Sequence, residues 1–265
     1  MTHMDPSDPG STPSIARIYD YVLGGSANFQ VDREAAQVLL DAFPGERDYA
    51  WINRAFLRRA VTELCALGVD QFLDLGSGIP TVGNVHEIAH RVNPEARVAY
   101  VDIDPVAVHH ARGLLDGDPR VTATEADVRD PRSVLDAPGV RGLLDLDRPV
   151  AVLVVALLDI LEVDDAGALV AAYRDACAPG SALVVTNGCQ MAATDAELEA
   201  FRAVLARTPT PTMTMRSADE VAALFAGYTL LEPGVVPSAA WRPDVPVTAE
   251  QAAGSNSWGA VGLRA

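Results

Sequence analysis

The chain has 265 residues, which is enough for one large α/β domain with an extension or for two small domains. Its formal charge of −16 at pH 7 and its pI near 4.5 argue against nucleic acid and anionic membrane surfaces as partners, because both favour a basic protein face. All twenty basic residues are arginine, which we attribute to codon bias in a GC-rich genome.

Cysteine usage and the lack of long apolar runs both indicate a soluble, cytoplasmic protein. Cys65, Cys177 and Cys189 are scattered and lack CxxC spacing, as is typical of reduced thiols. The polar N-terminus has no apolar signal core, and the longest apolar run, residues 150–158, is too short to span a bilayer.

The first quarter of the chain predicts helices only. Residues 1–12 are rich in Pro, Ser and Asp, and we expect a disordered tail there. Residues 13–68 are predicted to form a helical N-terminal cover. Its three helices are expected at 15–23, at 32–42 with Asp32 as N-cap, and at about 49–67 before Gly68.

Residues 69–265 alternate between strand and helix patterns, which predicts a single α/β domain. Near-continuous apolar strands separated by helices are typical of a parallel sheet covered on both faces. Two last strands, at 228–236 and 257–263, have no long helix between them and are expected to close the sheet as an antiparallel pair. The other strands are predicted at 71–75, 97–103, 121–126, 149–158 and 181–187, and the helices at 84–92, 105–115, 164–177, 195–206 and 217–225.

A glycine-rich turn follows the first predicted strand, with the sequence DLGSGIP from Asp74. Glycine tolerates positive φ and lets the backbone approach a ligand closely, so Gly76, Ser77 and Gly78 are candidate ligand contacts. As a dinucleotide fingerprint the turn is imperfect, because Thr81 occupies the third glycine position. The Asp74 carboxylate would repel a pyrophosphate and attract an ammonium group. We therefore favour S-adenosylmethionine over a dinucleotide; the alternative is an ordinary strand–helix turn.

Two further acids end the next two predicted strands. Asp102 can accept hydrogen bonds from both ribose hydroxyls, whereas Asp104, followed by Pro105, is better placed to cap the next helix; the two roles can be exchanged. Asp127 can accept from an adenine amino group while the Val128 N–H donates to a ring nitrogen. Acids at three adjacent strand ends indicate the crevice of an open α/β sheet.

The order DxGxGxP, VDxDP and ADVRDP along the chain resembles class I S-adenosylmethionine-dependent methyltransferases. From about residue 13 to the C-terminus, the chain is similar to an actinobacterial methyltransferase family formerly filed as a domain of unknown function. This resemblance implies a Rossmann-like, seven-stranded fold, S-adenosyl-L-methionine as cofactor, and Ile103 and Ala156 as further cofactor contacts. The matching segments are 17–25, 28–29, 32–36, 84–87 and 232–236.

The resemblance also implies a role for the N-terminal segment, because such extensions cover the cofactor in methyltransferases of this shape. Tyr19, Tyr21 and Asn28 are then expected at the methionine end, with Gly24 and Gly25 giving clearance. The alternative is a helix that packs on the sheet edge and is ended by these glycines.

The chain departs from the family pattern at three places. Ser26-Ala27 replaces a charged pair, Asp159 stands where the family looks to carry histidine, and 186–188 replaces a Ser-His type sequence. Asp159 is the candidate catalytic residue, because burial should raise its pKa and suit it to act as a general base or to orient the substrate. The alternative is a helix cap or a loop carboxylate.

The segment from His86 to His90 matches HExxH, a zinc-protease motif. Zinc catalysis needs a third protein ligand, and no downstream ligand set follows the motif. We therefore predict no metal site.

These observations predict an S-adenosylmethionine-dependent methyltransferase that acts on a small-molecule acceptor, with a protein acceptor second and nucleic acid third. Two alternatives stay open: an NAD-dependent oxidoreductase, which would use the same glycine turn and Asp102, and an S-adenosylmethionine-binding regulator without catalysis.

Overall fold

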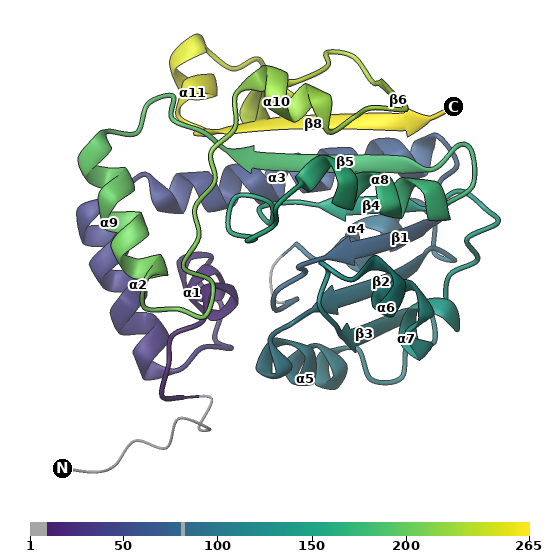
Figure 1. Ribbon diagram of the computed structural model, residues 1–265, viewed down its shortest axis with the longest axis horizontal. Coiled ribbons are helices and arrows are strands. Elements are labelled where there is room, and N and C mark those ends of the chain that lie inside the picture. Colours follow the sequence, from purple (N-terminus) through teal and green to yellow (C-terminus); the bar gives the residue numbers. More distant parts are fainter. Residues whose placement is uncertain (1–9, 81–82) are drawn as a thin grey trace.

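One mixed sheet organises the computed structural model, which describes residues 10–80 and 83–265 (Figure 1). Within these residues the sheet has eight strands in the order β3-β2-β1-β4-β5-β8-β6, and β7 pairs with β8. Strands β1 to β5 are parallel, whereas β8 is antiparallel to β5, β6 and β7. The strands are β1 Gln71–Leu75, β2 Arg97–Asp102, β3 Val121–Glu125, β4 Ala151–Val154, β5 Ala182–Gly188, β6 Tyr228–Leu230, β7 Val236–Pro237 and β8 Ser257–Arg264.

Helices cover both faces of this sheet, as the apolar strand runs predicted. Helices α6, α7, α8 and α10 pack in the core on one face, and α3, α4 and α5 pack on the other. The helices are α1 Ile15–Val22, α2 Gln30–Ala42, α3 Glu46–Ala66, α4 Val85–Val92, α5 Pro105–Leu114, α6 Pro131–Asp136, α7 Pro138–Arg141, α8 Ala166–Ala176, α9 Asp195–Leu205, α10 Ala218–Ala223 and α11 Ala249–Ala253, with a 3₁₀ turn at Ser238–Ala240. No helix among the described residues has both the length and the apolarity needed to cross a membrane.

The predicted parallel sheet with terminal antiparallel strands is confirmed, with two differences in its strands. The run 228–236 divides into β6 and β7, because a turn at Gly234, where φ is +85°, interrupts it. The predicted strand 149–158 is shorter, since Ala156 adopts a φ of +52° and takes the chain out of the sheet. The structure therefore has a path of seven strands plus β7.

The N-cap prediction for Asp32 is wrong. Helix α2 starts at Gln30 with Phe29 as N-cap, and Asp32 lies one turn further in. Its carboxylate accepts from the Phe29 N–H at 2.8 Å, from the Ser14 N–H at 2.9 Å and from Arg17 Nε at 2.7 Å. The same carboxylate thus satisfies the N-cap N–H of α2 and ties α1 to α2. Of the predicted disordered tail, residues 1–9 lie outside the described residues.

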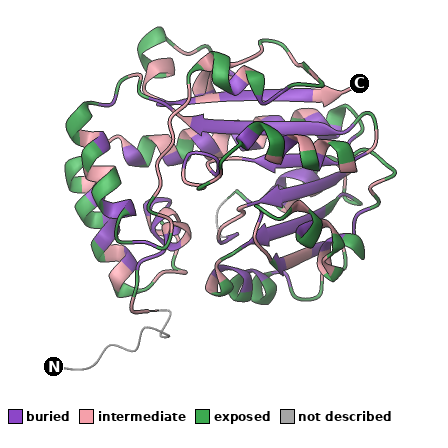
Figure 2. Ribbon diagram, viewed as in Figure 1, coloured by how far each residue is buried: buried purple, intermediate pink, exposed green. Residues whose placement is uncertain are grey.

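The helical N-terminal segment takes part in two different cores. Helices α1 and α2 pack with α9 in a small apolar cluster of their own, which Figure 1 shows beside the sheet. Helix α3 instead buries Phe56, Leu57, Ala60 and Leu64 against the sheet. Strands β1, β2, β4, β5 and β8 are buried along most of their length, whereas α2 and α9 expose their outer faces (Figure 2).

Candidate functional site

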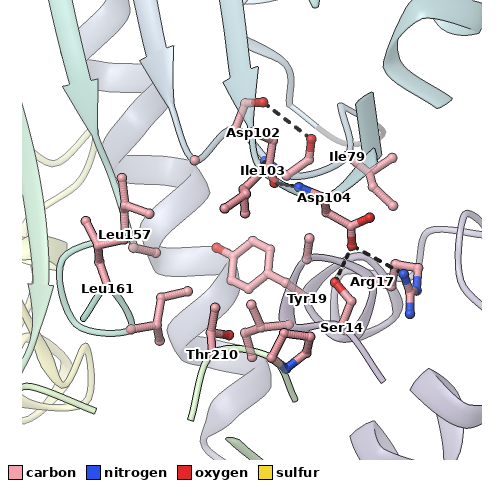
Figure 3. Close-up of a pocket in the computed structure, with 18 of the residues that line it drawn as sticks. Ser14, Arg17, Tyr19, Ile79, Asp102, Ile103, Asp104, Leu157, Leu161 and Thr210 are labelled. Atoms are coloured by element: carbon pink, nitrogen blue, oxygen red, sulfur yellow. Dashed lines mark hydrogen bonds and ion pairs between the residues drawn. The ribbon is translucent and has the colours of Figure 1, made fainter. Parts of the chain in front are cut away.

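A cavity of about 600 Å³ lies at the C-terminal ends of β1 to β4 (Figure 3). One side, the sheet wall, consists of the residues at and just after these strand ends. The other side, the helical wall, consists of lining residues from 12–23, from α3 and from the loop 209–212. Ligands of open α/β sheets bind at this edge, so the fold and the cavity agree on the position of the site.

The glycine turn of the sheet wall requires glycine at two positions. Gly76 and Gly78 have φ values of +65° and +62°. A Cβ on Gly76 would lie 2.5 Å from Leu157 Cδ1, so a larger residue there would have to displace the Leu157 side chain. The Gly76 and Ser77 N–H groups donate to the Val101 carbonyl at 2.8 and 3.1 Å, which anchors the turn to β2.

Asp102 and Asp104 divide two roles at the end of β2. Asp102 accepts from the Gly78 N–H at 2.7 Å through Oδ2 and from the Asp104 N–H at 2.8 Å through Oδ1. Burial raises the pKa of Asp102, and these backbone donors oppose the rise. Asp104 caps α5 by accepting from the Val106 N–H at 2.8 Å, which confirms its predicted structural role. Each Asp102 oxygen keeps a second lone pair for a ligand.

Asp104 also joins the two walls, as the dashed lines of Figure 3 show. Its Oδ2 accepts from Ser14 Oγ at 2.6 Å and from Arg17 Nη1 at 3.2 Å. The Arg17 side chain is 4% exposed and is also paired with Asp32 at 2.7 Å.

The end of β3 contributes Asp127 and Val128, and both line the cavity. Arg129 holds the Asp127 carboxylate at 2.7 Å, and this hydrogen-bonded cation lowers the pKa of Asp127. Ile103 and Ala156, predicted as cofactor contacts, line the cavity as well. The positive φ of Ala156 is a strained backbone conformation of the kind that clusters at functional sites.

Asp74, near the C-terminal end of β1, is the first acid of the sheet wall in chain order. Its side chain is buried, and burial raises its pKa to about 7, although the nearby Arg54 opposes the rise. Arg54 and its neighbour Asn53 belong to α3 and also line the cavity. The sequence analysis missed both. The available signal was an asparagine in the apolar stripe of α3, between Ala50 and Leu57.

Tyr19 reaches the cavity and Tyr21 does not. The Tyr19 ring projects toward the sheet wall (Figure 3), and the Arg54 guanidinium lies 5.4 Å from its centroid. Tyr21 packs with the apolar cluster of α1, α2 and α9. Two residues along a helix are about 200° apart around the axis, so a helix that presents Tyr19 to the cavity turns Tyr21 away.

Asn28, expected at the methionine end, and Gly24 and Gly25, expected to give clearance there, do not line the cavity. Asn28 Nδ2 donates to Asp20 Oδ2 at 2.8 Å, and Asp20 lines the cavity in its place. A Cβ on Gly25 would lie 2.0 Å from Asp20 Oδ1, so this glycine makes room for the Asp20 carboxylate.

Asp159 does not line the cavity either. Its Oδ2 accepts from the Tyr49 hydroxyl at 3.1 Å, and burial raises its pKa, as expected from the sequence. Glu46 lies in the same buried region, and desolvation and the Asp159 charge raise its pKa to about 8. Helix α8 is capped by Asp165, so Asp159 is not the cap of that helix. Its catalytic role stays a prediction.

The HExxH histidines are engaged by protein groups. His86 Nδ1 lies 2.8 Å from the Tyr100 hydroxyl, and His90 Nε2 lies 2.9 Å from the Ala96 carbonyl. Across residues 10–80 and 83–265, no group of three or more His, Cys, Asp or Glu side chains is arranged to hold a metal ion.

A glycine turn and acids at three neighbouring strand ends define a nucleoside-binding α/β protein. The model of the S-adenosyl methyltransferase family matches residues 3–265, so the chain belongs to this family. The protein is therefore an S-adenosylmethionine-dependent methyltransferase, and S-adenosylmethionine is its cofactor. The family predicted from the motifs is confirmed.

Two solved structures are similar over nearly the whole chain. A candidate methyltransferase from Thermobifida fusca is 41% identical, with a TM-score of 0.88, and the match covers 96% of this chain and 95% of that one. A DUF574 family protein from Streptomyces avermitilis is 36% identical, with a TM-score of 0.87, and the match covers 97% and 99% of the two chains.

A more distant structure shares the fold alone. It is the 1,6-didemethyltoxoflavin-N1-methyltransferase of Burkholderia thailandensis with bound 1,6-didemethyltoxoflavin and S-adenosylhomocysteine. It is 18% identical, with a TM-score of 0.51, and the match covers 88% of this chain and 89% of that one. No protein of curated function matches the chain.

Proposed function

We propose that the protein transfers a methyl group to a small, largely apolar acceptor without negative charge. The observation that carries this proposal is the composition of the cavity, which has acids at three strand ends and largely apolar residues at the β4 end and in the loop 209–212. Its volume of about 600 Å³ suits small ligands, whose pockets span about 300–1,000 Å³.

The sheet wall fits the cofactor. Asp102 binds the ribose hydroxyls, Asp127 and Val128 bind the adenine ring, and Gly76 to Gly78 provide the close approach. The free lone pairs of Asp102 and the positive φ of both glycines support this assignment. S-adenosylmethionine supplies a methyl group on a sulfonium, and the excess of acids over arginines along the cavity favours such a cation.

The helical segment 13–68 acts as a cover and the domain 69–265 supplies the strand ends. The contacts of Asp104 with Ser14 and Arg17 support this division of roles, because they hold the cover against the sheet edge. A held cover excludes water and fixes the donor and acceptor in line, and such positioning can contribute up to about 7–11 kcal/mol to lowering the barrier.

The acceptor lies between the β4 end and the loop 209–212. Of the three described arginines in the lining, Arg17 and Arg129 are paired with carboxylates, so an anionic acceptor would find no free cation in either. The lining hydroxyls of Thr210 and Thr212 can orient a polar atom of the acceptor. The lining is otherwise largely apolar there: Leu157, Ile160, Leu161, Pro209 and Pro211.

We place this reaction in the cytoplasm. Cys65, Cys177 and Cys189 are free and buried, which supports a reducing compartment.

The test is calorimetry with S-adenosylmethionine, followed by transfer of labelled methyl to a metabolite library sorted by charge. We expect binding and transfer to neutral or cationic apolar compounds. Transfer confined to anionic compounds would contradict the acceptor class. Binding without transfer to any compound or cell extract would indicate a non-catalytic regulator, and binding of NADH instead would indicate an oxidoreductase.

The role of Asp159 can be tested once an acceptor is found. Asp159→Asn is expected to lower kcat and leave cofactor affinity unchanged, because the carboxylate lies outside the cavity lining. An unchanged kcat would assign Asp159 a structural role through its bond to Tyr49.

A further inference from the structure

One end of the cavity, where α3 meets the end of β1, holds polar side chains that lack protein partners. Asp74 from β1 and Asn53 and Arg54 from α3 all line this end. Asn53 is 0% exposed and Asp74 is 6% exposed, so neither side chain is solvated as a surface group would be.

Asn53 and Arg54 keep hydrogen-bonding atoms without a partner among the described residues. Both amide atoms of Asn53 and the Nε of Arg54 are buried and make no hydrogen bond within the described chain. The Asn53 amide lies near the Tyr49 hydroxyl and moderates the rise of the Tyr49 pKa, but the pair does not reach hydrogen-bond geometry. Since buried polar groups are almost always paired, these atoms indicate a binding site for a polar ligand group.

The Asp74 carboxylate also lacks a hydrogen-bond donor from the part of the chain that the structure describes. No hydrogen bond to its carboxylate comes from any residue in 10–80 or 83–265, in contrast to Asp102, which accepts from two backbone N–H groups. Arg54 is near enough for its charge to lower the Asp74 pKa, yet the two side chains form no ion pair in the described structure. The Arg54 guanidinium packs over the Tyr19 ring instead.

A carboxylate, a guanidinium and a primary amide thus face one space without pairing among themselves. This set complements an α-amino acid, whose ammonium needs an acceptor and whose carboxylate needs donors. The amide can serve both groups, because Nδ2 donates and Oδ1 accepts. The cavity end also adjoins the glycine turn, so an amino acid there can be part of the same ligand as a nucleoside on the sheet wall.

We propose that Arg54 and Asn53 bind the carboxylate of the methionine part of the cofactor, while Asp74 binds its ammonium group. This inference rests on the proposed function, since it assumes that S-adenosylmethionine occupies the cavity. Arg54 becomes a cofactor-binding residue that stacks on Tyr19 and receives its carboxylate partner from the ligand.

Truncated ligands distinguish the binding of the methionine carboxylate from the binding of its ammonium group. Calorimetry at pH 8 would compare S-adenosylmethionine, its decarboxylated form, which keeps the amine, and 5′-methylthioadenosine, which lacks the amino acid part. Arg54→Gln is expected to weaken S-adenosylmethionine binding by about 10–100-fold and to leave the other two ligands nearly unchanged. Asp74→Asn is expected to weaken the two amine-containing ligands and to spare 5′-methylthioadenosine.

Two further variants serve as controls, one for the loss of an arginine from α3 and one for the charge at position 54. Arg47→Gln alters an arginine on the same helix that bonds to the Val22 carbonyl and does not line the cavity, so it should change no affinity. Arg54→Lys keeps the charge and should recover part of the lost affinity for S-adenosylmethionine.

Two results would overturn the inference: equal loss of affinity for all three ligands in Arg54→Gln, or no loss for any. If the wild-type protein binds none of the three, the proposed function fails instead. If Arg54→Gln raises the KM of an amino-acid acceptor and leaves cofactor affinity intact, the site belongs to the acceptor and the assignment is wrong.

Discussion

The two walls of the cavity differ in how their polar groups are satisfied. On the sheet wall, Asp102 and Asp127 find donors within a few residues or on the adjoining turn. On the helical wall, Asn53 and Arg54 keep buried atoms without partners. The sheet wall is therefore organised by the chain itself, whereas the helical wall is completed by a ligand. Asp74 lies on the sheet wall, but its carboxylate resembles Asn53 and Arg54 on the helical wall in lacking a hydrogen bond from the described residues.

Arg17 forms a buried ion pair with Asp32 inside the helical N-terminal segment and also bonds to Asp104 on the sheet wall, so removing Arg17 should have the largest effect. Arg17→Ala leaves Asp32, which is 0% exposed, as an uncompensated charge. Removing one partner of such a pair costs about 3–5 kcal/mol, so thermal denaturation should show Tm lower by roughly 10 °C. Cofactor affinity should also fall, because Asp104 loses a contact that holds the cover.

The matched control is Arg58→Ala. Arg58 pairs with Asp244 on the surface, where both side chains are largely solvated, so the expected loss is under about 1 kcal/mol. Equal stability of the two variants would show that the cover is not held by Arg17.

The second prediction concerns the sheet wall alone. Asp102→Ala should weaken S-adenosylmethionine binding by about tenfold or more, since one or two charge-assisted hydrogen bonds to the ribose are lost. Glu125→Ala, an exposed acid at the end of β3, should leave the affinity unchanged. Calorimetry that finds the same affinity in Asp102→Ala as in the wild type would remove the ribose assignment.

The smallest expected effect is a pH dependence of cofactor affinity that arises from Asp74. Burial raises the pKa of Asp74 to about 7 in the free protein, so the carboxyl is mostly protonated below that pH. An ammonium group requires the ionised form. Affinity for S-adenosylmethionine should therefore fall as pH drops below 7, by about tenfold per unit.

Calorimetry between pH 6 and 8, in buffers of different ionisation enthalpy, should detect the proton released on binding. Asp74→Asn should abolish both the release and the pH dependence, whereas Glu46→Gln, which alters a buried acid outside the lining, should retain them. If Asp74→Asn keeps the same pH dependence of S-adenosylmethionine affinity, a group other than Asp74 is the one that titrates.

Local sequence signals predicted the sheet wall well. A strand that ends in an acid fixes that residue at the C-terminal edge, because parallel strands all end on the same side. Asp74, Asp102 and Asp127 therefore line one cavity, as their spacing indicated. Asp104 caps its helix for an equally local reason, since Pro105 follows it.

Predictions that depended on side-chain direction were less successful. Tyr21 and Asp159 lie next to lining residues in the chain but point into other parts of the structure. Asp32 was predicted as a helix N-cap, but its carboxylate instead accepts hydrogen bonds from Ser14, Arg17 and Phe29. Successive side chains on a helix point about 100° apart. An error of one or two positions in a helix prediction therefore turns a side chain expected in the cavity away from it.

The sequence by itself determined the family, the parallel sheet and the three acids at its edge, because strand periodicity, turn glycines and caps are local properties. Only the tertiary structure decided which face of α1 and α3 meets that edge. The packing of α1 with α2 and α9, and of α3 with the sheet, is what brings Tyr19, Asn53 and Arg54 opposite Asp74. These contacts join residues far apart in the chain, and no local pattern specifies them.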